Sequence, residues 1–520
     1  MRLTITRVLG DGPFAEIGEP TAVAASGGLV AVGGDLGSLY WDGDGSADTL
    51  WAQYRLGVYG GGRCRMLEVA SWRVNALAFH PSLPLLAVGT GSYDGGNYFD
   101  GELLVFDVET GEGISLIEDE REVRRVRWTD ERTLEVLVAP PNDDDFTDSH
   151  GRGFAEVIVR DDWRAPEPHR LGEHVDEHSV PTGDAGAALD RLREVAGESW
   201  TPRGQVWAVA ATRDGGVIAG RQGVLLERWT AGGEPAWSVP DEGGAKQLLV
   251  DPGGETSLVN VTRPWRPGPE GWHWGPDHVF RISLDDGRVL ARLDEGWPVV
   301  LSGARDGSVL LRHTNYREEH PAVLRNPEGG KAGSVALHGC DTVNQPFAIR
   351  GADRPLVLVG EPDAPHRDKW VAAVGENAAL DRLFPLEWDA ELGRHLFGGP
   401  GVLAGDTLVH AGSVYNGRGL LPGNAFVVAR NARTGEARWV HTADVPVTAI
   451  DSDGVRVHVA YNDGGLHVLD LADGGILHYE ELTVHDRPVV LLSLALDGPD
   501  RLLAGTVDGR ILDLAIGREA

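Results

Sequence analysis

The segment VHVAYNDGGLHVLDLADGG (residues 457–475) reads as two short apolar strands joined by a tight turn. The first apolar run ends at Tyr461 and the second ends at Asp470, with Asp463-Gly464 between them. Asp-Gly pairs favour the two-residue turns that join antiparallel strands. Strands this short and this apolar are typical of sheets that are buried on both faces, because a half-exposed strand alternates apolar with polar residues. The segment therefore predicts two central strands of an antiparallel sheet packed between other sheets.

The same pattern recurs along the chain as four strands joined by short connections. The third strand of each unit aligns best, because it ends near an Asp or a Thr-Gly pair, and ten copies can be counted. The copies are LLVFDVETG (103–111), HVFRISLDDG (278–287), FVVARNARTG (426–435), LHVLDLADGG (466–475) and RILDLAIG (510–517), and more weakly SLYWDGDG (38–45), FAEVIVRDDW (154–163), VLLERWTAGG (224–233), PAVLRNPEGG (321–330) and WVAAVGEN (370–377).

A four-strand unit cannot bury its own faces, so successive units must pack side by side, and a closed ring leaves only short strand edges. Only four residues follow Ile516, which leaves no room for a fourth strand in the last unit. The strand-like segment 2–9 is predicted to supply that strand. We therefore expect an all-β fold, a β-propeller of four-stranded blades over residues 1–520, which the N-terminal strand closes.

The number of blades stays open, because ring propellers have about 4–8 blades. In one interpretation a unit is miscounted, and ARDGSVLL (304–311) is the most ambiguous segment, since it fits either a first-to-second or a second-to-third hairpin. In the other, the chain forms two smaller rings with a boundary near 175–204, a segment without a strand pattern.

A short helical insertion is predicted inside the segment 175–204. Four apolar residues recur there at helical spacing, and the glycine that follows them suits the position just after a helix end. An apolar helix face must be buried, either against the propeller or in the groove of a partner. The residues are Leu189, Leu192, Val195 and Ala196, followed by Gly197.

Long insertions interrupt six units at one position, between the second and third strands. Strand direction alternates in an antiparallel sheet, so these connections leave from one end of every sheet. In repeat proteins, the face that collects such insertions is often the binding face. Units nine, ten and one have short hairpins and are expected to form a low sector through which a ligand or partner enters. The insertions are 92–100, 140–153, 263–277, 314–321, 361–369 and 412–424.

Two of the third strands carry a family resemblance. LLVFDVETG and LHVLDLADGG are similar to the third strand of a WD40 repeat, with Asp107 and Asp470 where that family places the Asp of its Trp-Asp pair. The segment ARTGEARWV (432–440) resembles the quinoprotein-type repeat. The chain thus resembles a bacterial WD40-like or quinoprotein-like β-propeller repeat protein over its whole length. This resemblance implies the fold and leaves the function open, and the Gly-His pair typical of WD40 units is missing.

Composition restricts the class of partner. The formal net charge is −32, whereas a phosphate-binding surface needs clustered cations, so nucleic acid is not an expected partner. Cys64 and Cys340 lie far apart and have no metal-ligand spacing, which favours a reducing compartment. Neither a signal-peptide core nor an apolar run of membrane-span length is present, so we expect a cytoplasmic, acidic protein away from the membrane.

Aromatic residues in the insertions are the candidate partner-binding residues. Three tryptophans lie on the proline-stiffened insertion RPWRPGPEGWHWGPD (263–277), and rigid aromatic anchors dominate many protein interfaces. The alternative is that they pack on neighbouring loops as a lid. The candidates are Trp265, Trp272 and Trp274, together with Tyr93, Tyr98, Phe99 and Tyr415.

Two segments contain weak metal-binding patterns. The insertion PPNDDDFTDSHG offers carboxylates that suit a hard cation such as Ca²⁺, although its spacing is not that of an EF-hand, and a solvated acidic loop is the simpler interpretation. In GEHVDEHS two histidines lie four apart, as zinc ligands on a helix do, but no third ligand is identifiable. The candidate ligands are Asp143, Asp144, Asp145 and Asp148, with His150, and His174 with His178.

No phosphate-binding Gly-rich loop, nucleophile elbow or catalytic-cysteine signature is present, so no catalytic residue is assigned. No cofactor is expected. Quinoprotein enzymes are exported proteins, and this sequence has no signal-peptide core, so the resemblance to the quinoprotein-type repeat does not imply a bound quinone. Two hypotheses remain. The first is a non-catalytic protein-interaction scaffold or sensor subunit that binds a protein partner through the insertion-bearing face. The second is a propeller enzyme or small-ligand-binding protein with a site over the central channel.

Overall fold

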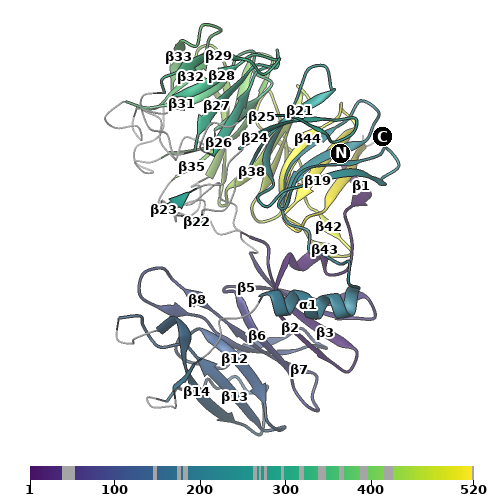
Figure 1. Cartoon of the computed structure of the whole chain (residues 1–520), viewed down its shortest axis with the longest axis vertical. Helices are drawn as coiled ribbons and strands as arrows, with labels where there is room; N and C mark the ends of the chain where they lie inside the picture. The colour runs from purple at the N-terminus through teal and green to yellow at the C-terminus, as the bar shows by residue number, and fades with distance from the viewer. Residues whose placement is uncertain are drawn as a thin grey trace. The chain divides into compact units, whose positions relative to one another are not determined.

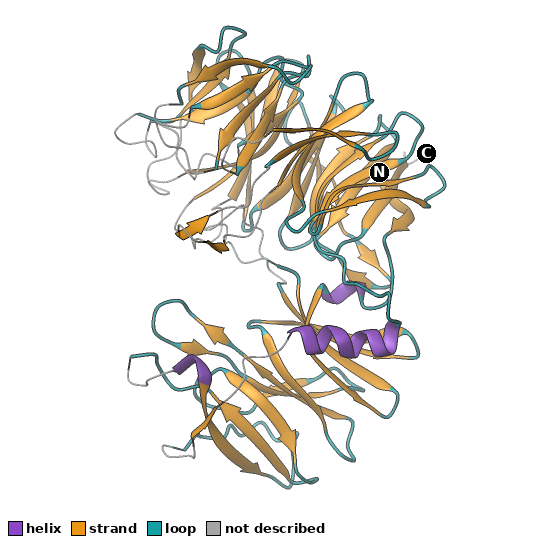
Figure 2. Ribbon diagram, viewed as in Figure 1, coloured by secondary structure: helices purple, strands orange, loops and turns teal. Residues whose placement is uncertain are grey.

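The computed structural model describes most of the chain, and nearly all of its regular structure is β-strand (Figure 2). Most of the strands form four-stranded antiparallel sheets, so the all-β prediction is confirmed. The described residues are 1–37, 53–144, 149–172, 177–179, 185–261, 266–268, 271–273, 278–293, 298–314, 321–337, 347–361, 368–386, 396–414 and 425–517.

Two compact units make up the chain. The larger unit contains Met1–Gly10, Leu39–Asp48 and Gln205–Ala520, and the smaller unit contains Asp11–Ser38 and Thr49–Gly204. The division after Gly204 lies at the end of the segment 175–204. Figure 1 shows the elements of both units.

The larger unit holds seven sheets in its described residues, besides the short hairpins β22–β23 (Arg266–Gly268, Gly271–His273) and β42–β43 (Thr483–Val484, Arg487–Pro488). In chain order the first three sheets contain β16 (Val206–Ala211), β17 (Val217–Arg221), β18 (Val224–Trp229) and β19 (Pro235–Pro240); β20 (Ala245–Val250), β21 (Thr256–Val261), β24 (Val279–Ser283) and β25 (Val289–Leu293); and β26 (Val299–Gly303), β27 (Val309–His313), β28 (Ala322–Arg325) and β29 (Lys331–Val335).

The remaining four sheets follow the same antiparallel pattern with one exception. Strand β30 (Ala348–Arg350) pairs in parallel with β34 of the next sheet and has no pairing with β31. The other strands are β31 (Leu356–Val359), β32 (Trp370–Val374) and β33 (Leu380–Pro385); β34 (Leu396–Ala404), β35 (Thr407–Val414), β36 (Ala425–Asn431) and β37 (Ala437–Ala443); β38 (Val447–Ser452), β39 (Arg456–Tyr461), β40 (Gly465–Asp470) and β41 (Ile476–Glu481); and β44 (Leu491–Leu496), β45 (Arg501–Thr506) and β46 (Ile511–Gly517).

The N-terminal strand β1 (Arg2–Leu9) completes the last sheet. It pairs antiparallel with β46, from Arg2 opposite Gly517 to Leu9 opposite Ile511. This is the pairing that the missing fourth strand of the last unit predicts. Leu3 and Leu9 are 5% and 3% exposed, so β1 contributes to the core as well as to the sheet.

The first strands of the seven sheets lie next to one another. Contacts join β16 to β20, β20 to β26, β26 to β30, β30 to β34, β34 to β38 and β38 to β44, and β44 also contacts β16. One apolar cluster contains Val206 and Val217 from the first sheet and Leu503 and Ile511 from the last. The first sheet therefore packs against both the second sheet and the last.

The smaller unit holds three four-stranded sheets in its described residues, and the middle one contacts the other two through β6. Their strands are β2 (Glu19–Ser26), β3 (Leu29–Asp35), β4 (Tyr54–Gly60) and β5 (Arg63–Ala70); β6 (Val74–Phe79), β7 (Leu85–Thr90), β10 (Leu103–Asp107) and β11 (Gly113–Ser115); and β12 (Val123–Trp128), β13 (Thr133–Val138), β14 (Arg152–Val159) and β15 (Glu177–Ser179). The hairpin β8–β9 (Ser92–Tyr93, Phe99–Asp100) and the 3-10 turns η1 (Ala15–Ile17) and η2 (Ser149–Gly151) complete it.

The helix α1 (Ala185–Ala196) covers the first sheet of the smaller unit, where it contacts β2. Leu192 is fully buried in a cluster with Phe14 and Ile17, whereas Val195 is 52% exposed. Gly197 has a φ of 107° and its amide donates to the Arg193 carbonyl, as the sequence predicted for the residue after the helix. Leu192 therefore packs within the helix's own unit, while Val195 of the same predicted face stays exposed.

The first repeat differs from its sequence interpretation. Its predicted third strand, 38–45, lies outside the described residues, and the third strand is β4. The sequence pattern does not indicate β4 as a strand, because glycines interrupt YRLGVYG. A Cβ on Gly57 would stand 2.7 Å from the Tyr59 ring and 2.8 Å from Ile17 Cδ1, so a larger residue there would require these two side chains to shift. The segment 304–311 forms a first-to-second hairpin, because it joins β26 to β27.

Candidate binding pocket

In chain order, all six predicted insertions follow the second strand of their repeat. Five of them join the second and third strands of an antiparallel run, and 361–369 joins β31 to β32 of the three-stranded sheet, in which β30 is not paired. In the second sheet of the larger unit, Ala245 at the start of the first strand pairs with Val261 at the end of the second. The insertion that follows Val261 therefore leaves from the end of the sheet at which the first strand begins. The neighbouring sheets have the same antiparallel strand order. Their insertions therefore also leave from the end of the sheet at which the first strand begins.

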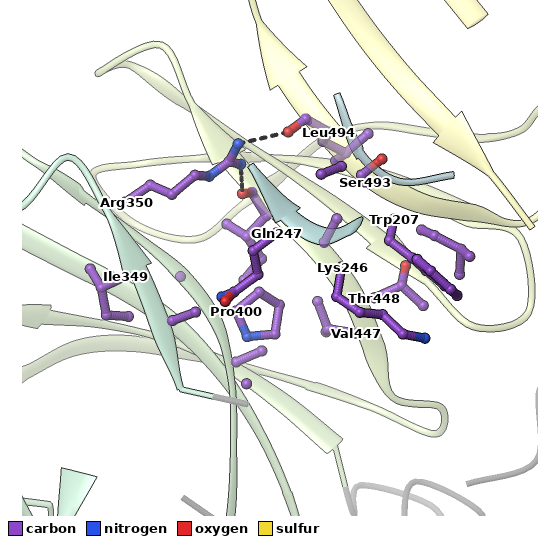
Figure 3. A pocket seen from close by; sticks show the side chains of 18 of the residues that line it. Trp207, Lys246, Gln247, Ile349, Arg350, Pro400, Val447, Thr448, Ser493 and Leu494 are labelled. Carbon is purple, nitrogen blue, oxygen red and sulfur yellow. Dashed lines mark hydrogen bonds between the residues drawn. The ribbon is translucent and has the colours of Figure 1, made fainter. Parts of the chain in front are cut away.

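The larger unit has a pocket with a volume of about 310 Å³, which the first strands of its seven sheets line (Figure 3). Most of the wall is apolar, and glycines in β34 form part of it. A Cβ on Gly398 would stand 2.7 Å from the Cβ of Phe347, so this part of β34 has no space for a side chain. The apolar lining includes Val209, Leu248, Leu301, Ile349, Val447 and Leu492.

Three polar side chains of the pocket join neighbouring first strands. Gln247 on β20 donates through Nε2 to the Leu301 carbonyl at 3.2 Å and accepts from the Leu301 amide at 2.6 Å. Thr448 on β38 donates to the Leu491 carbonyl at 2.5 Å. Ser493 on β44 donates to the Val206 carbonyl at 3.1 Å, which joins the last sheet to the first. These groups stabilise the packing of the sheets.

Arg350 reaches from β30 to two strands beyond the neighbouring sheet. Its Nη1 donates to the Leu494 carbonyl at 2.8 Å, and its Nη2 donates to the Ile450 carbonyl. The guanidinium also lies 3.5 Å from the Asp451 carboxylate. A single arginine thus ties β30 to β38 and β44 along one wall of the pocket (Figure 3).

Lys246 and Trp207 lie together on another wall. The Lys246 Nζ stands 3.3 Å from the centroid of the Trp207 ring, a cation–π arrangement. The Trp207 indole donates to Gln205 Oε1 at 2.6 Å, which orients the ring. Both residues come near the start of their strands, at the end from which the insertions leave, and Figure 3 shows them on the opposite side of the pocket from Arg350.

No sequence motif marks these pocket residues as a site. One signal was available, since Lys246 is one of only three lysines in the chain, with Lys331 and Lys369. The contacts that make the pocket join strands that are far apart in sequence, so no local motif marks it.

The predicted aromatic candidates have different environments. Tyr98 is 54% exposed, whereas Phe99 is 1% exposed. The ring centroids of Phe99 and Tyr93 lie 5.0 Å apart with the rings tilted, so Phe99 is a core residue of the insertion. The His150 ring from the neighbouring insertion lies 4.8 Å from Tyr93. Trp265, Trp274 and Tyr415 lie outside the described residues; Trp272 belongs to β23, and its side chain is not described.

The candidate metal ligands do not form a described metal site. Asp143 accepts hydrogen bonds from Tyr93 and Ser149, and its amide donates to the Asn97 carbonyl. Burial and then the Asp143 carboxylate raise the pKa of the Tyr93 hydroxyl. Hydrogen bonds therefore join the two insertions 92–100 and 140–153 to each other.

The remaining metal candidates lie elsewhere. The backbone of Asp144 donates to Asn97, and Asp145, Asp148 and His174 fall outside the described residues. His178 lies in strand β15, which pairs with β14 and extends the third sheet, so this histidine is not on a helix. Among the residues that are described, no group of three or more His, Cys, Asp or Glu side chains is arranged to hold a metal ion.

The predicted low sector needs one correction. The first repeat does not have a short hairpin, because the connection between β3 and β4 covers residues 36–53. In the larger unit the second-to-third connections are short in three sheets, at 222–223, 462–464 and 507–510. These sheets are neighbours, since β16 contacts β44 and β44 contacts β38. Trp207 belongs to one of them.

No protein-family model and no curated protein matches this chain. No helix in the described part of the chain has the length and apolar composition needed to cross a bilayer.

Proposed function

We propose that this chain is a non-catalytic binding protein, a scaffold or sensor subunit of the cytoplasm, that holds a protein partner at the insertion-bearing ends of its sheets. We infer that the seven sheets of the larger unit close into a seven-bladed propeller. The contacts of β16 with both β20 and β44, and the N-terminal strand in the last sheet, support that closure. The smaller unit adds three further blades of the same WD40-like type.

The recurrent position of the insertions carries this proposal. Six insertions of different sequence share one place in the repeat, between the second and third strands. Connections at the other end of the sheets, such as 212–216 and 304–308, are short. A repeat protein that elaborates one end of its sheets concentrates its binding surface there.

Replacing residues 263–277 with a short Gly/Ser hairpin tests the proposal. We expect the midpoint of thermal unfolding to stay nearly unchanged, because surface connections tolerate changes in length. Capture of the protein partner from a lysate of the native host is expected to be lost, as quantitative mass spectrometry of the captured proteins would show.

A full-length variant that carries Trp272→Ser and Trp274→Ser is the matched control. It keeps the length of the insertion and removes two of its three tryptophans, so it should lose much of the same partner. Undiminished capture of that partner by both variants would contradict a role of this insertion in binding.

A further inference from the structure

The pocket of the larger unit has a lining that contrasts with the rest of the chain. The chain has 79 acidic and 47 basic residues. Among the described residues that line the pocket, Lys246 and Arg350 are charged, and no Asp or Glu is present. A cationic lining inside an acidic protein attracts anions and disfavours cations.

The volume and the wall of the pocket define the size and body of a ligand. A volume of about 310 Å³ lies at the lower end of the range of small-molecule sites, which is about 300–1,000 Å³. The wall is mostly aliphatic, with the Trp207 ring beside Lys246. Such a wall suits an apolar ligand body and provides few polar groups for a sugar or a nucleotide.

The positions of the two cations restrict the charge of the ligand. The Arg350 guanidinium donates to the Leu494 and Ile450 carbonyls and stands 3.5 Å from Asp451, so much of its hydrogen-bonding capacity is used within the protein. Lys246 lies on the opposite side of the pocket, so the two cations do not converge on one group (Figure 3). A phosphate needs several converging donors, whereas a carboxylate with one negative charge needs a single cation such as the Lys246 ammonium.

We propose that this pocket binds a small organic carboxylate with one negative charge and an apolar body. The Lys246 ammonium holds the carboxylate, and the aliphatic wall and the Trp207 ring contact the rest of the ligand. The Gln247, Thr448 and Ser493 side chains keep the first strands together and leave the wall largely apolar. This inference does not depend on the protein partner proposed above, because it concerns the inner strands and not the insertions.

Isothermal titration calorimetry of the full chain with octanoate and with octanamide tests this site at pH 7. The two probes share a chain length and differ in charge. Octanoate is expected to bind with one site per chain, and octanamide about tenfold more weakly or worse, because it lacks the interaction with Lys246. Equal affinities, or no binding of octanoate, would overturn the proposal without any variant being made.

Three variants test whether Lys246 is the cation that binds the octanoate carboxylate. Lys246→Gln should weaken octanoate binding about tenfold and leave octanamide binding nearly unchanged, and Lys246→Arg should restore much of the loss. Lys331→Gln is the matched control, because Lys331 is an exposed lysine on β29 of the same unit. Unchanged octanoate affinity in a folded Lys246→Gln protein would place the ligand elsewhere. The variant without residues 263–277 should keep octanoate binding, which separates this inference from the proposed function.

Discussion

Removing residues 1–9 is expected to destabilise the larger unit by about 3–6 kcal/mol from two leucines alone, since burial of one leucine contributes about 1.5–3 kcal/mol. Leu3 and Leu9 are both nearly fully buried and belong to different apolar clusters of the last sheet. Removal of β1 would also leave one edge of β46 unpaired along seven positions, while β45 remains paired with the other edge. An apolar strand edge of that kind is prone to aggregation.

The ion pairs of Asp513 add to this effect. Asp513 is buried on β46 and accepts from Arg7 on β1 and from Arg501 on β45. Burial acts to raise the pKa of this carboxyl, but the hydrogen bonds from the two arginines prevail and lower it. Without β1, one of the two arginines is lost and the carboxylate becomes more exposed.

Hydrogen–deuterium exchange measures the effect of the truncation separately in the larger and the smaller unit. Peptides from 491–517 should lose protection in the truncated protein, while those from β6 and β7 of the smaller unit should keep it. Thr4→Ala is the matched control, because Thr4 is an exposed residue of the same strand and its loss should change stability by about 0.5 kcal/mol or less. Full protection of β46 in the truncated protein would mean that β1 does not stabilise the last sheet.

Local sequence patterns were sufficient for the strands and for the position of the insertions. The segment around Asp463-Gly464 forms the paired strands β39 and β40, although their connection covers three residues, 462–464, instead of two, and 2–9 pairs with β46. These features are local or depend on an obvious missing strand. The third strand of the first repeat was not predictable in the same way, because Gly57, whose Cα lies close to the Tyr59 and Ile17 side chains, interrupts the apolar run.

The pocket depends on contacts that no local pattern encodes, whereas the division into units lies at the end of 175–204, the segment without a strand pattern. Arg350 lies 100 residues or more from the carbonyls that it binds, and Lys246 meets Trp207 only because β16 and β20 are neighbours. The sequence around an isolated lysine or arginine in an apolar strand does not indicate which distant residue the side chain contacts. The charge of the pocket lining therefore became visible only when the first strands were placed together.

Acid is expected to destabilise the larger unit through buried histidines, most clearly His458. This residue lies on β39 and is fully buried. Within the described structure, neither of its ring nitrogens has a hydrogen-bond partner. Burial, followed by the Arg456 charge, lowers the pKa of His458 to about 4, and burial likewise lowers the pKa of His410 on β35 to about 4.

The direction of the pH effect follows from these pKa values. A histidine in the unfolded chain has a pKa of about 6.5, so between about pH 6.5 and pH 4 the unfolded chain binds more protons than the folded chain. The stability is fully present above pH 6.5 and is lost as the pH falls toward 4. Each of the two histidines contributes a loss of about 2 kcal/mol by pH 5, from a limiting slope of about 1.4 kcal/mol per pH unit.

Replacing His458 by leucine should reduce this acid sensitivity. His458→Leu removes a buried polar group without a partner, so we expect about 1 kcal/mol of added stability at pH 7. It should also reduce the loss between pH 7 and pH 5 by about 2 kcal/mol, as urea unfolding monitored by exchange in β39 and β40 would measure. His485→Asn, at an exposed position with a φ of 51° that asparagine tolerates, should follow the wild-type pH profile. If His458→Leu and the wild type lost stability in parallel as the pH fell, His458 would not be the group that takes up the proton.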